Sequence, residues 1–174
     1  MAEKNPSVVK SALTAGVLLG LAIVVYSLIL YFLDMSTNKY LGYVSWVIII
    51  VGLVMLQIQY RDKELNGNMP YGKAFGFGIL TLLFSTIITA VFSYVLFKFI
   101  DPGLIDKILG MQEAEMAKKG MTQEQIEMGI KMSKRFMSPA MMSVFALVGT
   151  MFIGTIITLV TSAFTRKDKT PFEA

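Results

Sequence analysis

The sequence contains no cysteine and no histidine. These absences exclude disulfides, thiolate nucleophiles, and imidazole as a general acid–base or as a ligand for zinc or haem. Charge is also scarce, since 16% of the 174 residues are charged while 55% are hydrophobic, and the mean hydropathy is +0.63. A soluble domain has about 25% charged and about 45–50% apolar residues. The composition therefore indicates an integral membrane protein.

The charged residues leave four long uncharged stretches, which run from Lys10 to Asp34, Lys39 to Arg61, Lys73 to Lys98, and Arg135 to Arg166. Each is long enough to cross a hydrocarbon core of about 30 Å as a helix that rises about 1.5 Å per residue. We predict an all-α fold, a four-transmembrane-helix bundle in a single membrane domain (1–174) with spans 11–33, 40–60, 74–97 and 140–163. Pro139 suits the first turn of the last span.

The first stretch also has the position of a secretory signal peptide. Its apolar run is longer than the usual h-region of about 7–15 residues, and no small-x-small cleavage site follows it. We expect an uncleaved first helix.

An even number of spans places both termini on one side of the membrane. That side carries eight basic residues in two short tails and one short loop: Lys4, Lys10, Arg61, Lys63, Lys73, Arg166, Lys167 and Lys169. The positive-inside rule acts most strongly on short segments, so we expect cytoplasmic termini. The net charge of +4 is then a topology signal. No basic stripe with interleaved aromatics accompanies it, so we expect no nucleic-acid partner.

An amphipathic helical connector, the extramembrane segment 101–137, separates the third and fourth spans. Asp101-Pro102-Gly103 ends the third helix, and Thr122 with Gln125 resembles a capping box that opens a second short helix after Gly120. Three interpretations stay open for this pair: a cap over the bundle, a pair lying in the membrane interface, or a methionine-rich surface for a partner. The candidate contact residues are Ile108, Met116, Ile126 and Ile130.

Small and hydroxylated residues repeat every four positions in three spans. They are Gly16 and Gly20 in the first, Thr81, Ser85, Thr89 and Ser93 in the third, and Thr150, Gly154, Thr158 and Ser162 in the fourth. Such stripes let helices approach closely, so the simplest interpretation pairs the stripes of the third and fourth spans. The alternative is a polar lumen. The spans contain no Asp, Glu, Lys or Arg, which argues against a proton-coupled transporter but not against a passive pore.

A glycine-containing segment, 71–78, opens the third span but lacks a Walker-type Gly-Lys-Ser/Thr. We expect Tyr71 and Lys73 to anchor this helix at headgroup level. The alternative is a contact with a lipid headgroup or a partner.

Several of these features occur together in a known family. They are the turn from Arg61 to Phe75, the run from Phe84 to Tyr94, the helix end Phe99-Ile-Asp-Pro102, the amphipathic connector, and a last span finishing in Thr165-Arg-Lys-Asp-Lys. In this order the chain resembles the DUF4199 family of small four-helix membrane proteins, found mainly in Bacteroidota. The resemblance implies the fold and the bacterial inner membrane. The family's function is unknown, so it implies no activity and no binding residue.

The sequence therefore favours a non-enzymatic structural or accessory subunit of a membrane complex. It lies in the lipid bilayer and has a membrane-protein partner or associates with itself. The alternative is a small transporter or pore component. An enzyme is disfavoured, because the acidic cluster of Asp101, Asp106, Glu113 and Glu115 is typical of a solvated helix. We expect no cofactor and no metal.

Overall fold

The computed structural model describes residues 7–167, and Lys4 and Lys169 of the predicted basic side lie outside them. The described residues contain six α-helices, in this order: α1 (Val8–Phe32), α2 (Lys39–Glu64), α3 (Tyr71–Val95), α4 (Leu104–Lys118), α5 (Gln123–Phe136) and α6 (Pro139–Thr165). A π-helix, η1 (Leu96–Ile100), continues α3. Within residues 7–167 the β-structure is limited to one isolated bridge, so the predicted all-α fold is confirmed.

Four of these helices are long and apolar enough to cross a membrane: α1, α2, α3 with η1, and α6. They coincide with the four predicted spans to within a few residues, and the protein is a multi-pass membrane protein. The largest difference is at the end of α2, which continues past the predicted limit at residue 60 to Glu64. Charged residues do not stop a helix. It ends where Asn66 and Gly67 take positive φ values of 51° and 82°.

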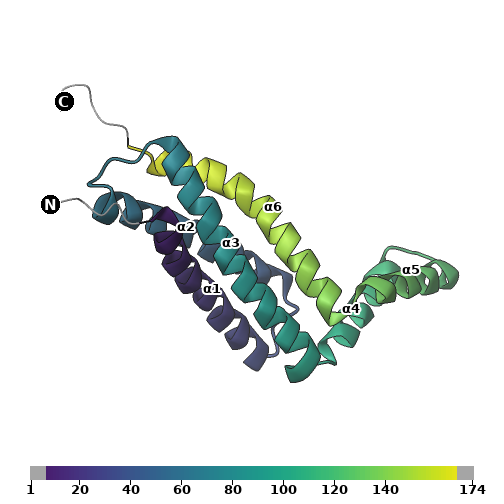
Figure 1. Cartoon of the computed structure of the whole chain (residues 1–174). Coiled ribbons are helices and arrows are strands. Elements are labelled where there is room, and N and C mark those ends of the chain that lie inside the picture. The colour runs from purple at the N-terminus through teal and green to yellow at the C-terminus, as the bar shows by residue number, and fades with distance from the viewer. Residues whose placement is uncertain (1–6, 168–174) are drawn as a thin grey trace. The chain divides into compact units, whose positions relative to one another are not determined.

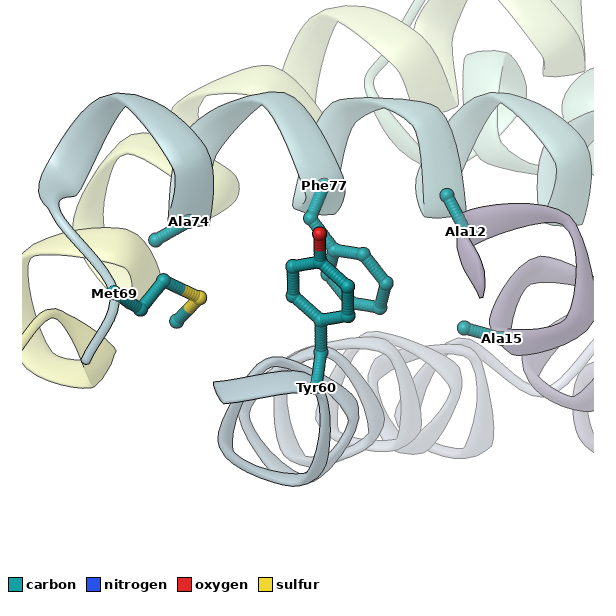
Figure 2. Close-up of a cluster of buried hydrophobic side chains, with 6 residues drawn as sticks. All are labelled: Ala12, Ala15, Tyr60, Met69, Ala74 and Phe77. Atoms are coloured by element: carbon teal, nitrogen blue, oxygen red, sulfur yellow. The ribbon is translucent and has the colours of Figure 1, made fainter. Parts of the chain in front are cut away.

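The described residues form two compact units, of which the first contains 7–89 and 149–167. In it α1, α2 and the adjoining parts of α3 and α6 lie side by side (Figure 1). Its buried cluster combines small and aromatic side chains, as Figure 2 shows: Ala12, Ala15, Tyr60, Met69, Ala74 and Phe77. The alanines bring the helix backbones close, and the aromatic rings fill the space that remains between α2 and α3.

The second unit contains residues 90–148, with α4 and α5 packed against each other (Figure 1). Gly120 takes a φ of 76° in the turn between them. Both bonds of the capping box are present, from the Thr122 amide to Gln125 Oε1 at 2.9 Å and from the Gln125 amide to Thr122 Oγ1 at 3.4 Å. The predictions of two short helices joined at Gly120, and of this capping box, are confirmed.

Candidate functional site

A cavity of about 400 Å³ opens between α1 and α2, close to the first turns of α1 and the last turns of α2. Its lining changes in character along these two helices. The charged and hydroxyl groups come from Lys10, Ser11, Lys63 and Glu64, near the helix ends, and the apolar groups come from further into the helices. The remaining lining residues are Thr14, Ala15, Leu18, Leu56, Gln59, Tyr60 and Phe77.

Two stacked aromatic rings form one wall of this cavity. The rings of Tyr60 and Phe77 lie 4.2 Å apart between centroids and are inclined by only 4°. Figure 2 shows Tyr60 rising from α2 to meet Phe77 on α3. Both side chains are nearly inaccessible to solvent, at 3% and 2% exposed. Offset stacking adds to the packing of α2 on α3, so this wall is held in place by the bundle itself.

The polar rim of the cavity carries more positive than negative charge. Ser11 Oγ donates a hydrogen bond to the Glu64 carboxylate, which links α1 to α2. Within residues 7–167, neither Lys10 nor Lys63 forms an ion pair. The rim therefore presents two ammonium groups and one carboxylate that already accepts a hydrogen bond.

Beside the cavity, Gln57 joins three helices through one side chain. Its Nε2 donates to the Ala74 carbonyl oxygen at 3.1 Å and to Ser162 Oγ at 2.9 Å. Its Oε1 accepts from Thr165 Oγ1 at 3.3 Å. Gln57 and Ser162 are fully buried, and Thr165 is 1% exposed. We call Gln57, Ser162 and Thr165 the Gln57 network. It gives hydrogen-bond partners to the NH2 group and to the carbonyl oxygen of the buried Gln57 amide, and burying an amide without such partners costs free energy.

The same end of the bundle is closed by bonds to the last turn of α6. Arg61 Nη1 donates to the Thr165 carbonyl oxygen at 3.1 Å, and this satisfies one of the carbonyls that a helix end leaves without a partner. Met69 and Lys167 exchange two backbone hydrogen bonds of 2.8 and 2.9 Å. The turn between α2 and α3 is thus attached to the segment that follows α6.

The small-residue stripe of α1 packs on α3. A Cβ added at Gly16 would lie 2.5 Å from Phe84 Cβ and 2.7 Å from the Thr81 carbonyl oxygen. A Cβ at Gly20 would meet the Ser85 carbonyl oxygen at 3.2 Å. The helix backbones approach here as closely as glycine allows, which is the packing expected for these two glycines.

The stripe of α6 contacts a neighbouring face of α3. Gly154 lies against the Leu82 side chain, and the methyl group of Thr158 lies where a Cβ on Gly78 would stand. Ser162 bonds Gln57 of α2. The direct pairing predicted for the two hydroxyl stripes therefore differs from the structure, in which glycines of α1 meet Thr81 and Ser85. The three other long helices, α1, α2 and α6, can each pack on a face of α3. The spacing of small residues along one helix does not determine which of them packs on a given face.

Two hydroxyl groups of these stripes bond their own helix. Thr158 Oγ1 donates to the Gly154 carbonyl oxygen at 2.7 Å, and Thr89 Oγ1 donates to that of Thr86 at 3.1 Å. Thr81 Oγ1 is buried and has no hydrogen-bond partner within residues 7–167. Ser93 and Thr150 are half-buried. Hydroxyls bonded in this way are compatible with close helix packing.

One family model, described as "Protein of unknown function (DUF4199)", matches residues 14–167. The chain belongs to the DUF4199 family. The suspected resemblance is thereby confirmed over a segment that contains the whole Gln57 network and nearly all of the four membrane helices. No curated protein and no solved structure matches the chain.

In this DUF4199 protein the two predicted anchor residues differ in their surroundings. Tyr71 Oη donates to the Leu159 carbonyl oxygen at 3.3 Å, which attaches the start of α3 to α6. The ring of Tyr71 also stacks on Phe75 with 6.3 Å between centroids. Lys73 is exposed. Tyr71 therefore has a packing contact, and Lys73 presents its charge at the surface.

The four candidate contact residues of the connector lie largely inside the second unit. Ile126 is buried at 5% exposed, and Ile108, Met116 and Ile130 are half-buried. The Met116 side chain fills the space beside Gly129 on α5. These apolar faces contribute to the packing of the unit, and their role as partner or lipid contacts stays a prediction. Other apolar side chains of α5 are the exposed ones.

Sequence reasoning missed the residues that make up the cavity and the Gln57 network. A signal was present, because Leu53, Gln57, Tyr60 and Glu64 recur at intervals of three or four residues and so share one face of α2. All but Glu64 are buried. An amide in the middle of such an apolar face requires a partner within the bundle.

Proposed function

We propose that this DUF4199 protein is a non-enzymatic accessory subunit of a bacterial inner-membrane complex, and that α5 provides its partner contact. The observation that supports this is a row of exposed apolar side chains on one face of α5. Met128 is 66% exposed, Met132 65% and Phe136 48%. Exposed apolar patches on a segment between membrane spans are typical of protein interaction sites.

The same row leads into a cavity of about 400 Å³ within the second unit. Its lining is almost entirely apolar and comes from α5 and the start of α6: Met132, Ser133, Phe136, Met137, Met142 and Phe145. Methionine side chains are flexible and adapt to varied partner surfaces. This combination supports a hydrophobic segment of another membrane protein as the partner, or a second copy of this chain.

Co-purification in mild detergent from native membranes tests this proposal. We expect a stable partner with the unmodified chain and loss of that partner in the double variant Met128→Gln and Met132→Gln. Met111→Gln is the matched control, because Met111 is 41% exposed on α4 and lies outside the row. A lone monomer from the unmodified chain would overturn the proposal, as would equal loss of the partner with the control variant.

The alternative is a small transporter or pore component that uses the hydroxyl stripes. The own-helix hydrogen bonds of Thr158 and Thr89 favour packing instead. Thr158→Val removes the hydroxyl and nearly preserves the side chain's shape. We expect unchanged solute flux in proteoliposomes for this variant, whereas a reduced flux in correctly folded protein supports the pore.

The proposed orientation places both termini in the cytoplasm. It is supported by the basic residues at that end of the first unit, among them Lys10, Lys63, Lys73 and Arg166. Because the chain has no cysteine, single cysteines can be introduced directly. A membrane-impermeant maleimide should label Ser36→Cys from the periplasmic side and Lys73→Cys only in inverted vesicles. The reverse pattern would refute this orientation.

A further inference from the structure

The cavity between α1 and α2 has the chemical layout of a lipid-binding site. We propose that it binds one phospholipid with an anionic headgroup, a role independent of the partner contact on α5. The phosphate lies between Lys10 and Lys63, and the start of the acyl chains lies against Leu18 and Leu56. All four of these residues line the cavity.

The charge of the rim selects an anionic lipid. Lys10 and Lys63 have no ion-pair partner within residues 7–167, so both ammonium groups are available to phosphate oxygens. The Glu64 carboxylate accepts a hydrogen bond from Ser11, which orients it within the link between α1 and α2. With two positive charges and one negative charge the rim favours a net negative headgroup. Basic pockets between membrane helices bind such headgroups.

The depth of the cavity matches the boundary between headgroups and hydrocarbon. Leu18 follows Lys10 by eight residues, so it lies about 12 Å deeper along α1. Leu56 precedes Lys63 by seven residues, which is about 10 Å along α2. The stacked Tyr60 and Phe77 side chains also line the cavity over this interval. Leu18 is 57% exposed, which gives the acyl chains a path from the cavity into the bilayer.

The size of the cavity fits part of a phospholipid. Ligand sites have volumes of about 300–1,000 Å³, and this one measures about 400 Å³. It therefore accommodates the headgroup, the glycerol and the first carbons of the chains. Ser11 and Thr14 line the cavity between Lys10 and Leu18 along α1, at the depth where the glycerol would lie. Their hydroxyl groups donate to Glu64 and to the Lys10 carbonyl oxygen.

Spin-labelled phosphatidylglycerol and phosphatidylcholine, added to the purified full-length protein in detergent, measure this binding by the immobilised fraction in electron paramagnetic resonance spectra. We expect phosphatidylglycerol to bind more tightly. Lys10→Gln and Lys63→Gln should each weaken its binding about five-fold, since one basic residue near a lipid surface contributes about 1 kcal/mol. Lys10→Arg and Lys63→Arg should preserve it.

Lys73→Gln is the matched control, because it removes the same charge from an exposed site at the same end of the bundle but outside the cavity. Thr14→Phe fills the cavity without changing its charge, and we expect it to abolish the preference for phosphatidylglycerol. Circular dichroism confirms that each variant is folded. Equal binding of both lipids overturns the proposal, and so does an equal effect of Lys73→Gln and Lys10→Gln. Spin-labelled phosphatidylethanolamine is measured in the same way; a preference for this lipid, whose ammonium group would pair with Glu64, overturns the anionic assignment.

Discussion

Replacing Gln57 with leucine tests whether the Gln57 network holds the bundle together. Leucine is close in size but cannot replace the hydrogen bonds to the Ala74 carbonyl oxygen, Ser162 Oγ and Thr165 Oγ1. Hydrogen bonds between membrane helices contribute about 0.6 kcal/mol each on average. The loss of three such bonds lowers the free energy of unfolding by about 2 kcal/mol.

Reversible unfolding in mixed micelles of mild detergent and dodecyl sulfate, followed by circular dichroism, measures this change. Gln59→Leu is the control, because Gln59 is an exposed glutamine on the same helix and we expect a change below about 0.5 kcal/mol. A double-mutant cycle of Gln57→Leu with Ser162→Ala should give a coupling energy of about 0.6 kcal/mol. The reasoning is refuted if Gln57→Leu is as stable as the unmodified protein, or if the cycle shows no coupling.

Three further substitutions test the packing in the same assay or by hydrogen exchange. Gly16→Ala should destabilise the bundle by about 1–3 kcal/mol, because its Cβ would meet Phe84 and the backbone of α3, whereas Gly76→Ala meets nothing within 4 Å and should not destabilise it. Tyr60→Ala should lower the free energy of unfolding by about 3–5 kcal/mol, and Tyr60→Phe should lower it much less, because the phenylalanine ring still stacks on Phe77. Equal losses of stability in the two variants would show that stacking is not the cause. Thr122→Ala removes the capping box, so hydrogen exchange of the backbone amides at the start of α5 should become faster. The expected loss in the free energy of local opening is about 1 kcal/mol. Unchanged exchange at these amides would contradict the prediction.

The positions of the membrane helices could be predicted from the sequence because one physical requirement decides them. A span must be apolar over about 20 residues, and the charged residues of this chain lie almost entirely at the ends of such stretches. The helix ends of the connector were equally readable, since Gly120 and Thr122 act through their immediate neighbours. Both kinds of signal are local, so no knowledge of the tertiary arrangement is needed.

The partners of each helix face depend on non-local packing, and here the sequence was a poor guide. Small residues at four-residue spacing mark a face where another helix can approach, but they do not name that helix. Thr81 and Ser85 meet Gly16 and Gly20, which are more than sixty positions away in the chain. The cavity was not predictable for the same reason, because Lys10 and Lys63 come together only when α1 and α2 pack.

The Gln57 network can be completed only after the last membrane helix, α6, has been made. Synthesis proceeds from the N-terminus, so α1, α2 and α3 enter the membrane before Ser162 and Thr165 exist. Until α6 arrives, the Gln57 amide has the Ala74 carbonyl oxygen as its available partner from this network. Insertion of the last helix supplies the remaining two bonds and, through Met69 and Lys167, fastens the turn between α2 and α3. A nascent chain that stalls before α6 therefore carries an incompletely bonded amide within the membrane, which is costly to bury.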